Sequence, residues 1–215
     1  MIRFENTKIT GFAAAFRGMR NPMNSWDKSD GYYNWENSAG SYRAGEFHPG
    51  KKDLELAQRL IKAGSDHRKF LRYITVTVDI TAPLYWWKEF DTYKVGTVAN
   101  SCSTMHKIHS KPFTLTDFSL DGGVNAADAH NYFKAIVQGL EMLRTSYNKT
   151  KDKAYWRALI QALPESYNQK RTILLNYEVL RNIYKSRQNH KLEEWSKGFM
   201  MWIDALDYAD ELIKL

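Results

Sequence analysis

Residues 74–94, ITVTVDITAPLYWWKEFDTYK, carry the clearest structural pattern in the chain. Four apolar side chains alternate with polar ones, at Ile74, Val76, Val78 and Ile80. This period of two predicts a strand with one buried face. Ala82-Pro83 then stops the strand, and Pro83 suits the first turn of a helix. We therefore expect a strand followed directly by a helix over residues 84–93.

Further elements follow from the spacing of apolar residues on either side. Residues 52–63 predict an amphipathic helix that Gly64 ends, and a helical turn follows over 67–73. Downstream, the pattern predicts a strand over 170–175 and helices over 126–147, 153–162, 176–187 and 190–213. Residues 94–111 show no clean period and are expected to be mainly loop.

The first fifty residues have a different character. Residues 8–12 predict a short strand, and residues 13–50 are rich in turn formers and aromatic side chains. We expect an irregular loop region there, which is a common place for binding functions. No linker or repeat divides the chain, so a single domain over residues 1–215 is expected, of α/β or α+β class and rich in helix.

Composition and charge narrow the class of protein. The 215 residues are 43% hydrophobic and 26% charged, which is ordinary for a globular chain. Lys and Arg outnumber Asp and Glu by 31 to 24, a net charge of +7 that favours anionic partners. No stretch approaches the roughly 20 apolar residues of a membrane helix, and no signal peptide is seen. One cysteine excludes an intrachain disulfide, which fits a reducing compartment. We therefore expect a cytoplasmic protein, and the lack of a long apolar stretch predicts no membrane contact.

Common catalytic and metal-binding motifs are absent, including GxGxxG, GxxxxGK[ST], HExxH and GxSxG. His106 and His109 have the spacing of two metal ligands on one helical face, but no third ligand is suggested, so no metal is expected. Nothing near Cys102 activates a thiolate, which favours a small buried thiol. Asn176 and Arg187 are 11 residues apart, about three helical turns, and would share one helix face. By spacing alone, a solvated helix face with caps is the favoured interpretation.

Three blocks resemble the flavin-dependent thymidylate synthases. Residues 79–94 are similar to the family's strand, Ala-Pro and helix segment, which ends in an Arg-His-Arg signature. Residues 163–187, LPESYNQKRTILLNYEVLRNIYKSR, resemble its Leu-Pro…Asn…Asn…Arg region without a gap. Residues 63–73 look like its Gly-His…Glu-His helix. The resemblance implies that family's fold with a central mixed sheet, in a homotetramer with active sites between subunits.

The resemblance also implies a reaction and its residues. The family binds FAD and methylates dUMP at C5, with methylenetetrahydrofolate and NADPH as co-substrates. Arg187 would bind the pyrimidine, and Arg187 and Ser103 would be the catalytic residues. The other nucleotide-binding residues would be Lys88, Glu89 and Asn100. The flavin would be contacted by His67, Tyr73, Tyr93, Lys94, Asn176 and Asn182.

The chain departs from the family pattern where cations are expected. Thr92, Tyr93 and Lys94 stand in place of Arg-His-Arg, so one positive charge remains of the signature. Tyr73 replaces a flavin-contacting histidine, and Glu178 replaces an arginine. Each lost charge-assisted contact weakens phosphate binding by roughly 1.5–3 kcal/mol. Lys88, Arg157 or Arg181 would be the compensating cations.

Three hypotheses therefore stand at the level of sequence. The leading one is a divergent flavin-dependent enzyme that transfers a one-carbon unit to C5 of a dUMP-like nucleotide. The second is a nucleotide-binding protein of the same fold whose catalysis is altered. The third is a protein that binds single-stranded nucleic acid through its charge and the aromatic N-terminal region, with Arg17, Arg20, Trp26 and Tyr32.

Overall fold

The computed structural model describes residues 2–38, 41–120 and 126–215. The chain divides into two compact units. Unit one comprises residues 1–5, 79–92 and 99–172, and unit two comprises residues 6–78, 93–98 and 173–215. Within the described residues, no helix combines the length and the apolar character needed to cross a membrane.

A four-stranded sheet has the strand order β1-β4-β6-β5. Its strands are β1 (Arg3–Thr10), β4 (Thr75–Pro83), β5 (Val98–Ser101) and β6 (Asn168–Asn176). The expected alternation is confirmed in β4, where Val76, Val78 and Ile80 are buried. The fold class is confirmed as well, but the sheet is antiparallel where a mixed sheet was expected. Residues 94–111 differ from the expected loop in supplying β5.

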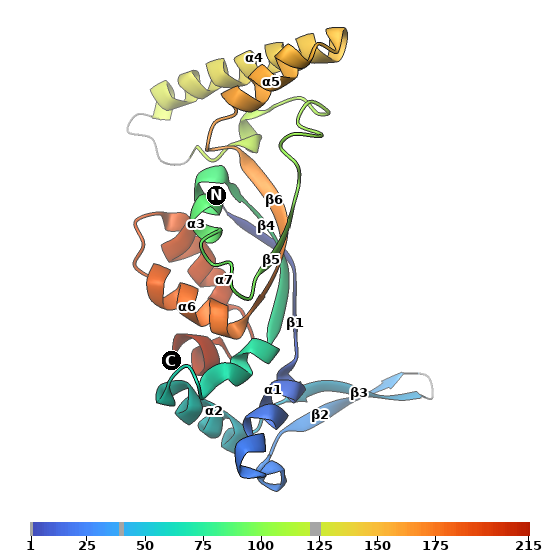
Figure 1. The fold of residues 1–215 in the computed structure, drawn as a ribbon, viewed down its shortest axis with the longest axis vertical. Coiled ribbons are helices and arrows are strands. Elements are labelled where there is room, and N and C mark those ends of the chain that lie inside the picture. The colour runs from blue at the N-terminus through green and yellow to red at the C-terminus, as the bar shows by residue number, and fades with distance from the viewer. Residues whose placement is uncertain (1, 39–40, 121–125) are drawn as a thin grey trace. The chain divides into compact units, whose positions relative to one another are not determined.

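Unit one contains helices α3 (Leu84–Phe90), α4 (Ala126–Thr150) and α5 (Lys153–Ala162) and the short 3-10 helix η4 (Leu115–Asp117). Figure 1 shows α4 and α5 side by side. The α5 helix has its expected bounds because Asp152 caps it, accepting a hydrogen bond from the Ala154 amide at 2.8 Å. A buried cluster joins both helices to the preceding loop, through Ile108, Phe113, Phe118, Leu140 and Leu159.

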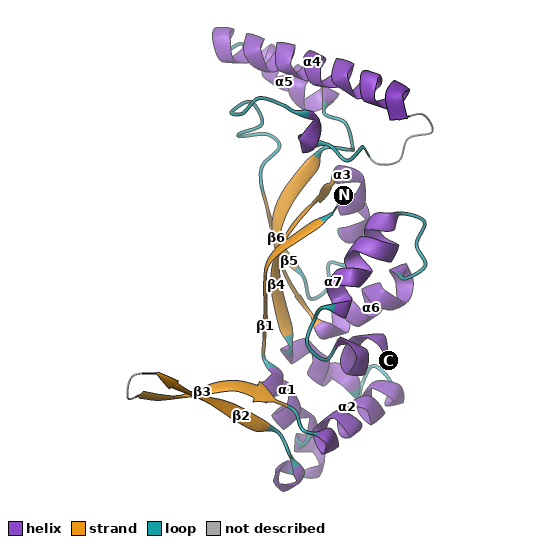
Figure 2. Ribbon diagram, turned by 180° about the vertical axis from the view of Figure 1, so that it is seen from behind, coloured by secondary structure: helices purple, strands orange, loops and turns teal. Residues whose placement is uncertain are grey.

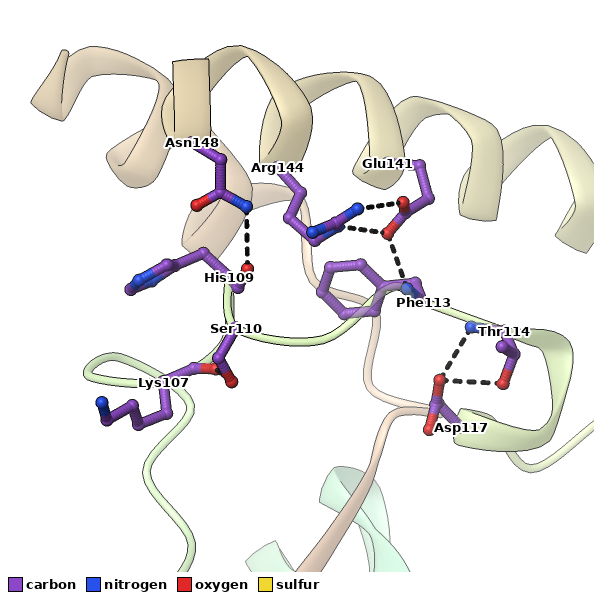
Figure 3. A network of polar contacts seen from close by, with 9 residues as sticks. All are labelled: Lys107, His109, Ser110, Phe113, Thr114, Asp117, Glu141, Arg144 and Asn148. Atoms are coloured by element: carbon purple, nitrogen blue, oxygen red, sulfur yellow. Dashed lines mark hydrogen bonds and ion pairs between the residues drawn. The ribbon is translucent and has the colours of Figure 1, made fainter. Parts of the chain in front are cut away.

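A carboxylate on α4 fixes this loop (Figure 3). Glu141 accepts hydrogen bonds from the Phe113 amide at 2.6 Å and from Arg144 Nε at 2.7 Å. Asn148 donates to the carbonyl of His109 at 3.1 Å. Burial alone would raise the pKa of Glu141, but the hydrogen bonds from Arg144 and Phe113 outweigh burial and hold it below its ordinary value. The loop is thus anchored by an ionised group.

Unit two contains α1 (Phe12–Met19), the hairpin of β2 (Tyr32–Ser38) and β3 (Ser41–His48), α2 (Lys51–Ala63) and α6 (Tyr177–Arg187). The hairpin begins beside α1 (Figure 2), where Phe16 and Phe47 have ring centroids 6.0 Å apart. The expectation of an irregular region over 13–50 was wrong for its described part, and residues 39 and 40 lie outside that part. Its turn formers separate short elements, including 3-10 helices η1 (Asn21–Met23) and η2 (Trp26–Lys28).

The C-terminal segment is not the single helix expected over 190–213. It forms the π-helix η5 (Glu194–Phe199), which continues directly into α7 (Met200–Asp204), and after a break the π-helix η6 (Asp210–Lys214). Two observations explain the break. Tyr208 has a left-handed backbone with φ of 56°, and the buried Tyr177 hydroxyl donates to the Asp207 carbonyl at 2.6 Å. The predicted apolar stripe is nevertheless buried throughout, at Trp195, Phe199, Trp202, Leu206, Ala209 and Ile213.

Candidate functional site

Asn176 lies where β6 ends and α6 begins. Its side-chain oxygen accepts a hydrogen bond from the Val179 amide at 3.0 Å, so Asn176 is the N-cap of α6. A β-carbon at Gly96 would lie 2.9 Å from the Asn176 amide nitrogen, so the chain passes close to this side chain. Asn176, which the resemblance places at the flavin, therefore already uses its side-chain oxygen to cap α6.

Arg187, at the end of α6, contacts Tyr93. Its Nε donates a hydrogen bond to the Tyr93 hydroxyl at 2.9 Å. The guanidinium also lies over two rings, 5.8 Å from the centroid of Tyr93 and 5.2 Å from that of Trp195. Trp195 is fully buried, whereas Arg187 and Tyr93 are half-buried. The structure thus brings together one expected nucleotide residue and one expected flavin residue.

Four other expected flavin residues of unit two are exposed. Tyr73 ends the 3-10 helix η3 (Arg68–Tyr73) with 61% of its surface exposed, and His67, Lys94 and Asn182 are exposed as well. Arg72 is also exposed on η3. An exposed aromatic ring can stack on a planar ring of a ligand. Exposed cations can bind an anionic pyrophosphate. The residues present therefore fit FAD in chemical type, with fewer cations than the family signature supplies.

Two further charged side chains of unit two already have hydrogen-bond partners within the protein. Glu178 is buried and accepts hydrogen bonds from Arg68 Nε at 3.1 and 3.2 Å. Arg181 is buried too, and its Nη1 donates to the carbonyls of Ile213 and Leu215. Burial lowers the pKa of Arg181, and the nearby charge of Arg68 lowers it further. Arg181 holds the C-terminal segment and is not a spare cation for a phosphate.

In unit one, Ser103 lies beside His106. The Ser103 oxygen accepts hydrogen bonds from the amides of Met105 at 3.1 Å and His106 at 3.0 Å. It also lies 2.9 Å from His106 Nδ1. A hydrogen bond therefore joins the Ser103 hydroxyl and the His106 ring. Sequence reasoning did not connect these residues, although their spacing of three is typical of such a turn.

The remaining expected nucleotide residues of unit one differ in surroundings. Lys88 is exposed and forms an ion pair with Glu165 at 2.7 Å, so it is not a free compensating charge. Glu89 is half-buried and Asn100 is exposed.

Cys102 is exposed, which contradicts the expectation of a buried thiol. Its backbone explains the position, because the Cys102 amide donates to the Lys170 carbonyl on β6 while the side chain stays at the surface.

The two spaced histidines do not act together. His106 pairs with Ser103, whereas His109 packs edge-on against Tyr147 with centroids 4.8 Å apart. Within the described ranges, no group of three or more His, Cys, Asp or Glu residues has the arrangement of a metal site. Sequence reasoning also missed Arg171. Its guanidinium carbon lies 4.2 Å from the ring centroid of the buried Trp87, and the guanidinium forms an ion pair with Asp91.

The fold as a whole is that of the flavin-dependent thymidylate synthases. One solved structure of thymidylate synthase ThyX from Helicobacter pylori, with FAD and dUMP, matches with a TM-score of 0.70 and 19% identity. The match covers 100% of this chain and 98% of that one. A second, of flavin-dependent thymidylate synthase ThyX from Helicobacter pylori complexed with FAD and dUMP, matches with a TM-score of 0.69 and 19% identity over 99% and 97%. No protein-family model matches the chain, and no curated protein does.

Proposed function

We propose that this protein is a flavin-dependent enzyme that binds a dUMP-like nucleotide and transfers a one-carbon unit to C5 of the base. The observation that carries the proposal is the whole-chain likeness to two structures that contain FAD and dUMP. Methylenetetrahydrofolate as carbon donor and NADPH as reductant belong to the proposal through the sequence resemblance alone. The enzyme is a cytoplasmic homotetramer in this proposal.

Arg187 is the main nucleotide-binding and catalytic group. Its guanidinium is planar and permanently charged, and a fork of N–H donors suits the oxygens of a pyrimidine. Negative charge on the ring makes C5 nucleophilic toward the one-carbon unit, and the same donors stabilise that charge. Trp195 supports the guanidinium from one side, so the fork is held before the nucleotide arrives. Ser103 is the second catalytic residue in this proposal, and Asn100, Glu89 and Lys88 are nucleotide-binding residues, as the sequence resemblance implies, with Lys88 leaving its exposed ion pair with Glu165.

FAD, when bound, supplies the redox capacity that one-carbon transfer with reduction requires. Tyr73 would hold the cofactor through its exposed aromatic ring, and Lys94 and His67 would hold it through their polar groups. Tyr93 and the polar side chains of Asn176 and Asn182 complete the binding residues. Exposure of Tyr73 and Lys94 supports this assignment, because both side chains present their surface to an incoming ligand.

The visible absorption spectrum tests the proposal. The purified protein is mixed with FAD, passed through gel filtration and scanned, with and without dUMP. Retained flavin absorption supports the proposal, and release of tritium from 5-tritiated dUMP then measures the reaction. Arg187→Gln should abolish tritium release, whereas Arg59→Gln removes an exposed charge on α2 and should not. A colourless protein that binds no added FAD would overturn the flavin chemistry.

One observation favours a second candidate function. The Tyr93 hydroxyl, at a position of the family signature, is engaged by Arg187, and Lys94 is the one cation left in that signature. These features suit a protein that binds a nucleotide without turning it over. Calorimetry with dUMP would then show binding, and tritium release would be absent with every reductant.

A further inference from the structure

A pocket in unit two lies apart in sequence from every residue that the resemblance assigns to flavin or nucleotide. It is formed by α1, η2 and both strands of the hairpin, and we call it the N-terminal pocket (Figure 1 labels α1, β2 and β3). It encloses about 150 Å³, and a cavity of about this size accepts one benzene ring. Its lining residues are Ala13, Arg17, Arg20, Trp26, Ser29, Tyr33 and Phe47.

The floor of the pocket is fixed by a buried ion pair. Arg20 Nη2 lies 2.6 Å from Asp53 Oδ1, and Nε donates to the same oxygen at 2.8 Å. The second Asp53 oxygen accepts from Ser29 Oγ at 2.7 Å and from the Gly31 amide at 3.2 Å. Arg20 Nη1 also donates to the Ser25 carbonyl at 3.2 Å. These contacts tie the segment carrying Trp26 to α1 and α2, so the pocket is formed without a ligand.

Aromatic rings make the walls. Trp26 is 50% exposed and Tyr33 is 42% exposed, which leaves ring surface available for stacking. The Trp26 indole donates to the Asn21 side chain at 2.8 Å, which sets the orientation of its ring. Phe47 packs edge-on against Tyr33 with centroids 5.3 Å apart. Such rings can stack on any base, because every base has a π-face.

Charge decides which planar ligand suits the pocket. The charge of Arg20 is compensated by Asp53, but Arg17 is exposed, and among the described residues its side chain forms no hydrogen bond or ion pair. Asp27 and Lys28 on η2 are adjacent exposed charges of opposite sign. The uncompensated group is therefore a guanidinium, which repels a cation and attracts a phosphate. An aromatic cage for a methylated ammonium is disfavoured for this reason.

We propose that the N-terminal pocket binds one nucleotide unit, with the base against Trp26 and Tyr33 and the phosphate on Arg17. The chemistry is shared by a free nucleotide and by one residue of a single-stranded nucleic acid. The inference is independent of the proposed catalytic function, because it uses none of the residues assigned to that function. Of the four residues that the sequence pattern suggests for strand binding, Arg17, Arg20 and Trp26 line the pocket, and Tyr32 does not.

Photochemical crosslinking tests the proposal with the full chain. One arm uses 5-iodo-dUMP, and the other uses a nine-residue deoxythymidine strand with a central 5-iododeoxyuridine. After irradiation, peptide mass spectrometry identifies the crosslinked residue. Crosslinks at Trp26 or Tyr33 with both probes indicate a site for free nucleotides, and crosslinks with the strand alone indicate a single-strand site. Absence of crosslinks at both residues with both probes overturns the proposal.

Matched variants separate the pocket from general electrostatics. Arg17→Gln should weaken binding of the fluorescein-labelled strand or of the nucleotide about tenfold, whereas Arg59→Gln removes the same charge outside the pocket. Tyr33→Leu should weaken binding by a similar factor, because a stacking partner is lost. Tyr132→Leu is the control, since Tyr132 is an exposed tyrosine of α4 that does not line the pocket. Equal losses in the variants and their controls would contradict a specific pocket. Circular dichroism checks that all four remain folded.

Discussion

Arg187 donates its Nε hydrogen to the hydroxyl of Tyr93, 2.9 Å away, while its guanidinium lies over the Trp195 ring. The contact joins the last residue of α6 to a loop residue 94 positions earlier. In the proposed function, the same guanidinium binds the pyrimidine. The internal acceptor and the ligand therefore compete for Arg187.

Removal of the Tyr93 hydroxyl tests this competition. Tyr93→Phe keeps the ring against Arg187 but removes the acceptor, so dUMP no longer displaces a hydrogen bond. A hydrogen bond contributes about 0.5–1.5 kcal/mol net, so we expect dUMP affinity to rise about two- to tenfold by calorimetry. Tyr132→Phe, at an exposed tyrosine of α4, should leave the affinity unchanged. Weaker dUMP binding by Tyr93→Phe would mean that the hydroxyl itself contacts the nucleotide.

The buried ion pair of Arg20 and Asp53 predicts a large loss of stability when it is broken. Asp53 is fully buried and accepts four hydrogen-bonding or ionic contacts, so Asp53→Asn leaves the Arg20 charge without compensation. We expect the free energy of unfolding to fall by about 3–5 kcal/mol in urea titrations. Glu193→Gln, which breaks an exposed pair with Lys197, should shift the urea midpoint little. Similar shifts in the two variants would contradict a structural role for the buried pair.

Two glycines, one before α1 and one within it, predict effects of opposite sign. Gly11 has φ of 98°, and a β-carbon there would lie 1.9 Å from the Tyr73 carbonyl oxygen. Gly11→Ala should therefore lower the unfolding free energy by about 2 kcal/mol or more. Gly18 lies within α1, and a β-carbon there would meet no atom within 4 Å, so Gly18→Ala should raise it by about 0.5–1 kcal/mol. Thermal melts of both variants measure the difference, and a stabilised Gly11→Ala would refute the close approach to Tyr73.

Acid should loosen the loop that Glu141 anchors. Its folded-state pKa lies below the unfolded value, so its stabilisation is present above the unfolded pKa and is lost as pH falls through the folded one. We expect Glu141→Gln to cost about 1–2 kcal/mol at neutral pH. The difference between wild type and variant should shrink in acid, as measured by urea midpoints across pH. Glu165→Gln, in the exposed pair with Lys88, should show little such trend. A difference that does not change with pH would show that the charge of Glu141 is irrelevant.

Local patterns predicted much of the fold. The alternation in β4, the change from strand to helix after Ala82-Pro83 and the bounds of α5 each depend on a few neighbouring residues, and all three are confirmed. The C-terminal helix was wrong because its break depends on Tyr177, which lies about thirty residues earlier in the chain and hydrogen-bonds the Asp207 carbonyl. The spacing of apolar residues within 190–213 does not indicate that contact.

The candidate site shows the same limit. Arg187 and Tyr93 were each singled out, but their contact joins distant segments and no local pattern encodes it. Asn176 also caps α6, a role that the sequence analysis did not name although Asn before a helix is a common N-cap. The N-terminal pocket was hardest to foresee, since its rings come from three short elements in a region whose turn residues suggested no regular structure.

The exposed position of Cys102 has a practical consequence. It is the one thiol of the chain, so a maleimide dye would attach at a single position without mutagenesis. The backbone on both sides is held, since the Cys102 amide donates to Lys170 and its carbonyl accepts from Gln169. A fluorophore placed there would sit one residue from Ser103 and would report, by its emission, whether a ligand reaches that stretch of the chain.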